Sequence, residues 1–585
     1  MKNYKEKKSK LSFLLICIFI LFLFSSFFIQ TCTTDTPPSI LTLVTEDVDG
    51  DGYIDRLVVT FDENVADATI VAGNFSVSVG SISEVVDDGV SDDAIIWVNL
   101  LDEAQLTDVV PQLTINAGGI EDLAGNPNAL VSNYASTDGA GPAILSAIAS
   151  DETNVIVGID NDDTVTVTFS ENTNQPVINA VNINGVLALS GGHSWLDGAG
   201  VITSVTWSSA DVLVVTLSDT TSDPTVAVGD TITLDGVTII DGTNNSSTVA
   251  FSEIAGTIYI AGYTRNSSNV DVPCYWKNGS RTDLSVLDAS KDGRSESIYP
   301  SGADIYVAGY TAKTSPSVFV PCYWKNGTRT PLSVLDSDQN GYAESILVSG
   351  NDIYVAGYTK NNSGVDVPCY WENRTRTDFP VLENTQAHSV YISGTDIYVT
   401  GESFSTSFVF VPRYWKNGLL VNDLPVIDTS KSGFANSIYI AETDIYISGN
   451  TSNSTDVYVP CYWKNESRTD LSVLDDTKHG YAQSIYVSGT DIYIAGYTTK
   501  TSPSVFVPCY WKNGSRTDLP VLGDTKDGYA QSIYVLNSII CVAGYTKDSS
   551  DVIVPCYWKN GLRTDLSVLD ATKNGCAESI YFYGF

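Results

Sequence analysis

Four aspartates within nine residues form the most distinctive chemical motif of the chain. The stretch DVDGDGYID runs from Asp47 to Asp55 and places carboxylates at its positions 1, 3, 5 and 9. Gly52, at position 6, permits the tight turn of a loop that surrounds a calcium ion with oxygen atoms. Without a cation, these carboxylates would repel one another. The motif therefore predicts a structural calcium site.

The expected ligands of this ion are Asp47, Asp49, Asp51 and Asp55, together with the backbone carbonyl of Tyr53. Position 12, where an EF-hand carries a bidentate glutamate, is Val58. We therefore expect a site of modest affinity that is not an EF-hand. The alternative is an ordinary Asp-Gly turn between two strands.

A second loop contains a weaker form of the motif. In DSDQNGYAE, the residues Asp336, Asp338, Asn340 and Glu344 follow the same spacing around Gly341. The loop resembles the FG-GAP calcium loops of integrin-type propellers, and this resemblance implies a second calcium site. Related stretches such as DDTKHGYAQ carry a lysine inside the loop. We therefore interpret the loop as a turn inherited by the copies, of which this one still forms a working calcium site.

The elements that position these residues belong to a repeat. A Tyr-Trp pair recurs at intervals of 44 to 48 residues, with its tryptophan at Trp276, Trp324, Trp371, Trp415, Trp463, Trp511 and Trp558. Each copy contains four short β runs, and an Asn-Gly turn suited to a tight hairpin occurs in five of the seven copies. Both faces of these strands are apolar, as sheets stacked around an axis require. The repeat predicts the blades of a β-propeller, with the tryptophans in blade cores rather than on a sugar-binding platform.

The two ends of the repeat array complement each other. The first copy begins at Thr257 with a second strand, and the chain ends in ESIYFYGF, which is a first strand with nothing after it. The C-terminal strand is therefore expected to complete the first of seven blades and to remove exposed sheet edges. An open solenoid is the alternative.

These copies resemble the YWKNG class of bacterial propeller repeats, which occurs in envelope proteins and implies no activity. The resemblance covers residues 256–585.

Residues 39–137 and 138–255 contain short strands ending in Val-Thr-Phe, as in LVVTFDENV and VTVTFSENT, together with GIEDLAGNP and VGDTITLDG. They resemble the Ig-like domains of S-layer and other bacterial surface proteins, which act mainly as spacers. The expected fold is all-β, with two Ig-like β-sandwich domains followed by a seven-bladed β-propeller.

One polar residue precedes the Ser-Ile or Ser-Val of the innermost strand in each copy. These residues are Glu296, Glu344, His388, Asn436, Gln483, Gln531 and Glu578. We expect them to line one mouth of the central channel and to hold water there. A ligand or cation bound on the axis is the alternative.

One sector departs from the repeat. Arg413 replaces the cysteine that six other copies share, and Phe404 and Leu420 lie in the unusual stretches SFSTSFVF and NGLLVNDLPV. These three residues are expected to contact a partner, and neutral drift is the alternative.

The six repeat cysteines occupy equivalent positions in neighbouring copies. These positions are expected to lie too far apart for disulfide bonds, so we expect buried thiols.

The N-terminus has the order of an export signal. A basic stretch, MKNYKEKKSK, precedes the apolar run LSFLLICIFILFLFSSFFIQTC. Its end at Cys32 resembles a bacterial lipobox, which implies a leader over residues 1–32, lipidation of Cys32 and a linker over residues 33–38. Ordinary cleavage nearby and an uncleaved membrane anchor are the alternatives. All three place the rest of the chain outside the cytoplasm, and we expect a membrane-anchored lipoprotein of the cell envelope that faces outside or the periplasm.

The charge and the missing motifs limit the function. A formal net charge of -38 without a basic stripe argues against nucleic acid as a partner. No GxSxG, HExxH or phosphate-binding glycine loop occurs, so the sequence identifies no catalytic residue. We expect a non-enzymatic binding or adhesion protein with an unknown protein or glycan partner at the cell surface. The alternatives are an exported propeller hydrolase with paired carboxylates and a structural surface-layer component.

Overall fold

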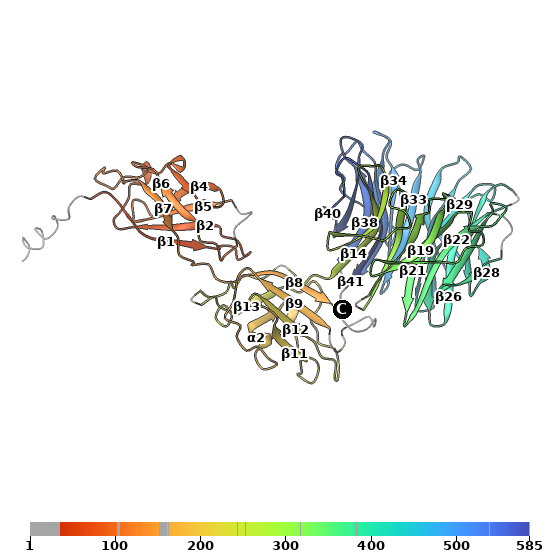
Figure 1. Ribbon diagram of the computed structural model, residues 1–585, viewed down its shortest axis with the longest axis horizontal. Coiled ribbons are helices and arrows are strands. Elements are labelled where there is room, and N and C mark those ends of the chain that lie inside the picture. Colours follow the sequence, from red (N-terminus) through yellow and green to blue (C-terminus); the bar gives the residue numbers. More distant parts are fainter. Residues whose placement is uncertain are drawn as a thin grey trace, which may run out of the picture.

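The structure is a computed structural model of a three-part chain. It describes residues 36–583, except residues 102–105, 151–158, 160, 162, 243, 252, 303, 316, 381–383, 406 and 537–538. The predicted leader, with Cys32, lies outside these residues. Figure 1 shows two small β bodies followed by a larger one, in which sheets are arrayed side by side.

The first body consists of two sheets around one core. The first sheet has the order β1-β2-β5-β4 and the second the order β3-β6-β7. Strand alternation directs Leu57 and Val59 inward from one sheet and Leu113 and Ile115 inward from the other, and all four are fully buried. The strands are β1 (Ile40–Glu46), β2 (Arg56–Phe61), β3 (Phe75–Val77), β4 (Ile82–Asp87), β5 (Ile95–Leu100), β6 (Gln112–Ile115) and β7 (Val131–Ala135), and two 3-10 turns span Asp67–Thr69 and Ala72–Asn74.

The second body has a four-stranded sheet, β11-β12-β9-β8, and a two-stranded sheet, β10-β13. Its core continues into the third body, because Ile232 and Ile254 belong to the same buried cluster as Ile539 and Phe582. The second body is therefore packed against the propeller. Its elements are β8 (Ile144–Ser150), β9 (Thr164–Phe169), α2 (Ile183–Val186), β10 (Leu187–Leu189), a 3-10 turn (Ser190–Gly192), β11 (Ser204–Trp207), β12 (Val212–Thr216) and β13 (Ile232–Leu234).

The third body repeats one four-stranded antiparallel sheet. Within the described residues, seven such sheets follow one another. The innermost strands are β17 (Gly293–Ser301), β21 (Gly341–Ser349), β25 (Thr385–Ser393), β29 (Gly433–Ala441), β33 (Gly480–Ser488), β37 (Gly528–Leu536) and β41 (Gly575–Tyr583). The second strands are β14 (Thr257–Arg265), β18 (Asp304–Ala312), β22 (Asp352–Lys360), β26 (Asp396–Phe404), β30 (Asp444–Ser452), β34 (Asp491–Thr499) and β38 (Ile539–Lys547).

The outer two strands of each sheet form the hairpin that contains the Tyr-Trp pair. The third strands are β15 (Asp271–Lys277), β19 (Phe319–Lys325), β23 (Asp366–Glu372), β27 (Phe410–Lys416), β31 (Tyr458–Lys464), β35 (Phe506–Lys512) and β39 (Ile553–Lys559). The outermost strands are β16 (Ser280–Asp283), β20 (Thr328–Pro331), β24 (Thr375–Asp378), β28 (Leu419–Asp423), β32 (Ser467–Asp470), β36 (Ser515–Asp518) and β40 (Leu562–Asp565).

The last strand completes the first sheet. β41 pairs antiparallel with β14, so that Ile580 lies opposite Ile260. The backbone amide of Ile298 also donates to the hydroxyl of Ser579 at 3.3 Å. At each junction between neighbouring sheets, an equivalent serine hydroxyl accepts a hydrogen bond from a backbone amide of the next innermost strand. For example, the amide of Ile346 donates to the hydroxyl of Ser297 at 3.1 Å. These bonds join the innermost strands into a closed cycle around one axis.

The repeated tryptophans lie in the interior, as the sequence predicts. Trp276, Trp324 and Trp558 are fully buried. The indole N–H of Trp324 donates to the carbonyl of Ser285 at 2.7 Å, and that of Trp558 donates to Pro520 at 2.8 Å. Six of the seven tryptophans thus fill apolar space and also tie their sheet to the preceding connection, namely Trp276, Trp324, Trp371, Trp463, Trp511 and Trp558. The eight described cysteines are buried and free.

Within the described residues, no helix is long and apolar enough to cross a lipid bilayer.

Candidate functional site

A β-bulge recurs in every innermost strand at the position of the polar rim residue. In β21 the register shifts between Ala343 and Ser345, so Glu344 is the extra residue of the strand. In β25 the shift lies between Ala387 and Ser389, around His388. A bulge removes one residue from the regular ladder and redirects its side chain. The repeated bulge explains why one polar residue per sheet faces the channel.

These bulged residues meet around a single cavity of about 190 Å³. Its lining consists of Glu296, Glu344, His388, Asn436, Gln483, Gln531 and Glu578, the whole set that the sequence placed at one channel mouth. We call this cavity the polar mouth.

A chain of hydrogen bonds runs along part of the polar mouth. The amide nitrogen of Asn436 donates to Gln483 at 2.9 Å, and Gln483 donates to Gln531 at 3.3 Å. Gln531 in turn donates to a carboxylate oxygen of Glu578 at 3.0 Å. In this series of hydrogen bonds, each side-chain amide donates toward Glu578.

Three carboxyl groups of the polar mouth have raised pKa values. Loss of hydration raises the pKa of Glu296 well above its usual value, and the negative charges of Glu578 and Glu344 raise it further. Loss of hydration also raises the pKa of Glu344 and of Glu578, while the hydrogen bond from Gln531 and the charge of Arg294 act against it at Glu578. Glu296 is therefore the carboxyl group most inclined to keep its proton, and Glu578 has a donor that favours its ionised form.

His388 adds a positive charge beside these carboxyl groups. Burial alone would lower its pKa, but the charge of Glu402 and its hydrogen bond, together with Glu344, raise the pKa of His388 to about 9. The two oxygens of Glu402 lie 2.9 and 3.0 Å from Nε2 of His388, and Glu402 is 3% exposed. His388 is thus protonated at neutral pH.

A second cavity, of about 310 Å³, lies further along the same strands. Six tyrosines line it, three residues after the rim position in each strand, and Leu347 takes the seventh place. Tyr486 and Tyr534 have ring centroids 4.6 Å apart, and Tyr534 and Tyr581 are 4.5 Å apart. Sequence reasoning missed this aromatic belt, although the constant three-residue offset from the rim residue was a readable signal. The tyrosines are Tyr299, Tyr391, Tyr439, Tyr486, Tyr534 and Tyr581.

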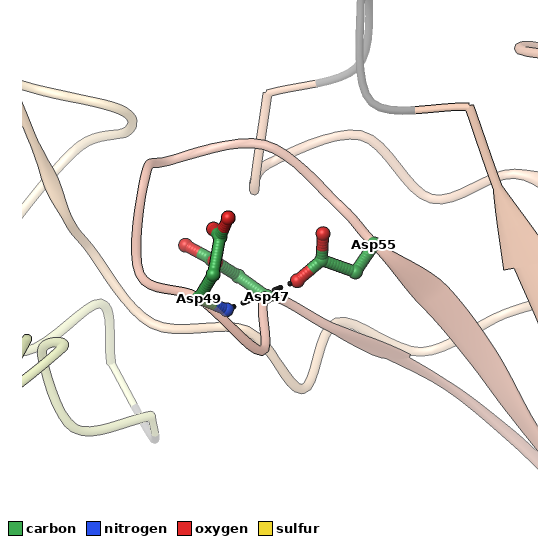
Figure 2. Close-up of side chains that lie close together, drawn as sticks. All are labelled: Asp47, Asp49 and Asp55. Carbon is green, nitrogen blue, oxygen red and sulfur yellow. Dashed lines mark hydrogen bonds between the residues drawn. The ribbon is translucent and has the colours of Figure 1, made fainter.

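The aspartate loop of the first body gathers three of its four carboxylates. Asp47, Asp49 and Asp55 each offer an oxygen within 4.8 Å of the others (Figure 2). Backbone amides of Gly50 and Gly52 donate to Asp47 at 2.7 and 3.0 Å. Burial, with added repulsion from Asp55 and Asp51, raises the pKa of Asp47 to about 6 despite these bonds.

The remaining two predicted ligands have other contacts in this loop. The carboxylate of Asp51 accepts from the backbone amide of Tyr53 at 2.9 Å. Gly52 has φ +95°, and a side chain there would collide with Leu145 of the second body. The loop therefore has a defined shape and presses against the neighbouring body.

The second predicted calcium loop does not assemble in this structure. Glu344 faces the polar mouth from its bulge, whereas Asp338 is exposed and lies 3.9 Å from Lys313 in an ion pair. The side chain of Asn340 accepts from the backbone amide of Phe319 at 2.9 Å. No cluster of carboxylates that includes Asp336 and Glu344 occurs among the described residues. The spacing in the sequence predicts that Glu344 lies with Asp336 and Asp338, but the bulge in β21 directs its side chain away from them and toward the polar mouth.

In the irregular sector, Phe404 and Arg413 are engaged within the fold, whereas the outermost strand β28 exposes Leu419, Leu420 and Val421. Phe404 packs against Phe410 with ring centroids 5.1 Å apart, and Arg413 is paired with Asp423 at 2.6 Å. Leu420, on the outermost strand β28, is 42% exposed. The structure brings no ligand-binding groups together at these three positions.

Comparison with known proteins informs only the fold. No protein-family model and no curated protein matches the chain. The β-propeller domain of the Trilobed protease from Pyrococcus furiosus is 10% identical over 54% of this chain and 94% of that chain, with a TM-score of 0.35. An ulvan lyase of polysaccharide lyase family PL25 is 11% identical over 49% and 87%, with a TM-score of 0.33. A GH43_1 enzyme from Xanthomonas citri, complexed with xylotriose, is 11% identical over 41% and 90%, with a TM-score of 0.24.

This comparison changes one prediction and confirms another. The prediction of an all-β chain with a β-propeller is confirmed. The comparison does not support the prediction of a non-enzymatic binding or adhesion protein: the matched solved structures include a lyase, an arabinanase, a β-xylosidase and two GH43 enzymes. At such low TM-scores the likeness carries no chemistry, which must come from this chain's own residues.

Proposed function

We propose that the chain is a hydrolase that cleaves glycosidic bonds at the polar mouth of its propeller. The observation that carries this proposal is the gathering of three carboxyl groups with raised pKa values around one cavity of about 190 Å³. Glycoside hydrolysis requires one protonated and one ionised carboxyl group at the same bond. Environments that push neighbouring carboxyl groups toward different protonation states supply this pair.

Glu296 and Glu578 are the best candidates for the two roles. Glu296 is the general acid in this proposal, because burial and the adjacent negative charges favour its protonated form. Glu578 is the base in this proposal, because the hydrogen bond from Gln531 and the charge of Arg294 oppose the rise in its pKa that burial causes. Glu296 would give its proton to the leaving oxygen as the glycosidic C–O bond breaks. Glu578 would take a proton from the water whose oxygen bonds to the sugar carbon.

The rest of the polar mouth suits a polyhydroxylated substrate. The amides of Asn436, Gln483 and Gln531 both donate and accept hydrogen bonds, as sugar hydroxyls do. Protonated His388 adds a donor and holds Glu344 near a positive charge. These side chains would orient the sugar ring over the carboxyl pair.

Release of reducing ends from a panel of plant, algal and bacterial polysaccharides tests this function. We expect E296Q and E578Q each to lower the rate at least 100-fold, because each variant removes one acid–base group. The matched control is E372Q, since Glu372 lies on β23, outside the polar mouth. Equal rates in E296Q, E578Q and wild type would contradict the assignment, and so would the absence of release from every polysaccharide.

The finer architecture is also part of this proposal. We read each of the seven sheets as one blade of a ring closed by β41, which the pairing of β41 with β14 supports. The two sheets of each preceding body support an Ig-like sandwich at residues 39–137 and at 138–255. The basic and apolar N-terminus supports export to the cell envelope, with an anchor at Cys32.

The aspartate loop is proposed to bind one structural calcium ion. The convergence of Asp47, Asp49 and Asp55 supports this site. Titration calorimetry with calcium on wild type and D49N tests it. We expect one fewer bound ion in D49N, and an unchanged number of ions would contradict the site.

A further inference from the structure

A second group of carboxylates lies where the first body meets the second. Asp138, Glu171 and Asp241 each offer an oxygen within 4.8 Å of the others. Asp138 lies in the linker between the two bodies, Glu171 follows β9, and Asp241 lies in a loop after β13. These residues are far apart in the sequence and form no motif. Only the packing of the linker against the second body brings them together.

Glu171 has an oxygen without a hydrogen-bond partner. The residue is 7% exposed, and its Oε1 has no partner among the described residues. An unsatisfied carboxylate oxygen at this depth is costly unless a proton or cation compensates it. Neither Asp138 nor Glu171 forms an ion pair with a described lysine, arginine or histidine. The site therefore has acceptors but lacks a compensating charge at Glu171.

The surrounding backbone holds the linker in place. The hydroxyl of Thr45, on β1, donates to a carboxylate oxygen of Asp138 at 3.4 Å and accepts from the amide of Gly139 at 3.0 Å. The amide of Thr137 donates to the carbonyl of Leu43 at 2.8 Å. Asp138 is thus tied to the first body.

The other two carboxylates are tied to the second body. Asn244 donates to both oxygens of Asp241, at 2.7 Å from its backbone and 2.9 Å from its side chain, and also to the backbone carbonyl of Asp138 at 3.4 Å. The amide of Ser170, next to Glu171, donates to the carbonyl of Ala143 at 2.9 Å. A group that joins the three carboxylates would therefore couple the two bodies.

We propose that Asp138, Glu171 and Asp241 bind one divalent cation of the hard, oxygen-preferring class, and that this cation fixes the first body against the second. Three carboxylates at this separation suit calcium, which accepts six to eight oxygen ligands in variable geometry. The hydroxyl of Thr107, from the first body, donates to Ser170 at 2.7 Å beside Glu171 and adds polar atoms to the surroundings. This site is separate from the polar mouth and from the aspartate loop.

Equilibrium dialysis of the purified full-length protein against calcium tests the proposal. We expect E171Q and D138N each to bind one fewer calcium ion per chain than wild type. D108N is the matched control, because Asp108 is exposed and adjacent to Thr107, and it should retain the wild-type number. D49N separates this site from the aspartate loop: E171Q should lower the number of bound ions by one in the D49N background as well.

A second measurement reports on the coupling of the two bodies. Spin labels on the exposed positions Val90 and Val237 give the spread of distances between them. We expect a chelator to broaden this distribution in wild type and to leave that of E171Q, already broad, unchanged. The same number of calcium ions in E171Q, D138N and wild type would overturn the proposal, as would a distribution that calcium does not alter. The circular dichroism of each variant shows that it has folded.

Discussion

The amide nitrogen of Gln531 lies 3.0 Å from Oε2 of Glu578, and this hydrogen bond opposes the rise in the pKa of Glu578 that burial causes. Glu578 and Glu296 occupy equivalent bulges of adjacent innermost strands, β41 and β17. Glu296 lies beside the negative charges of Glu578 and Glu344, which favour its protonated form. Equivalent positions of a repeat thus acquire different acid–base properties from the residues on either side.

Replacement of a rim glutamate should stabilise the protein while it removes activity. The pKa values of Glu296 and Glu344 are raised above 4.5, so the folded state holds more protons than the unfolded state above that pH. The free energy of unfolding therefore falls as the pH rises from 4.5 through the folded pKa values. E296Q and E344Q should each raise the free energy of unfolding by about 1 kcal/mol at pH 8. The gain is modest because the charge of Arg294 at Glu296, and that of His388 at Glu344, already offsets part of the cost of ionisation.

Urea unfolding at pH 4 and pH 8 checks this prediction. The increase in the free energy of unfolding in E296Q should be larger at pH 8 than at pH 4, because at pH 4 the wild-type carboxyl groups are protonated. E372Q should show no such difference. A variant that is less stable than wild type at pH 8 would indicate that Glu296 has a structural role in its ionised form.

The ion pair of His388 and Glu402 should make stability depend on alkaline pH. The pKa of His388 is raised from 6.5 to about 9. Its stabilising contribution is therefore complete below pH 6.5 and is lost as the pH rises through 9. H388Q should lose this pH dependence and lower the free energy of unfolding by about 3–5 kcal/mol, because the substitution removes the ion-pair partner of buried Glu402.

The double variant H388Q/E402Q is the control for this pair. It should recover most of the lost stability, because a neutral pair replaces a lone buried charge. Thermal unfolding between pH 6 and pH 10 measures all three proteins. Identical pH profiles for H388Q and wild type would contradict the prediction.

Arg374 occupies a turn position that favours glycine. Its φ is 75°, and the equivalent residue of the neighbouring hairpin, Gly327, has φ 78°. A side chain in this left-handed conformation is strained, whereas glycine adopts it freely. R374G should therefore stabilise the protein by about 0.5–1 kcal/mol, and the reciprocal G327R should destabilise it by about 1 kcal/mol. Urea midpoints measure both changes, and an R374G protein less stable than wild type would show that the arginine side chain contributes more than the strain costs.

The repeat made the propeller predictable, because each sheet carries its own local signals. Trp324 and Cys322 recur in register and are fully buried, and the Asn326-Gly327 turn forms the expected hairpin. The rim residues could also be predicted, since each stands at a fixed place before the innermost strand. Glu344 shows the limit of this reasoning, because a bulge decided that it faces the channel and not the calcium-type turn.

The features that sequence reasoning missed depend on contacts across the fold. In the sequence, the tyrosines of the aromatic belt cannot be told from ordinary strand residues. Only the closed cycle of innermost strands places Tyr534 and Tyr581 side by side. Asp138, Glu171 and Asp241 meet only because the linker packs against two loops. The pairing of His388 with Glu402 joins two strands of a sheet whose other copies lack both residues. Patterns in a single sequence predict periodic elements well, but they do not predict contacts between residues that are far apart in the sequence.

The most direct test of the account is the infrared absorption of carboxyl groups at neutral pH. We predict that wild type shows the band of protonated carboxylic acids, which shifts in deuterium oxide, and that E296Q loses the part of this band that Glu296 contributes, while Glu171, with its pKa raised to about 8 by burial, still absorbs. The band should persist in E578Q, because the proton resides on Glu296, and in the control E372Q. A spectrum of E296Q identical to that of wild type would show that Glu296 is ionised, and would contradict its role as the acid at the polar mouth.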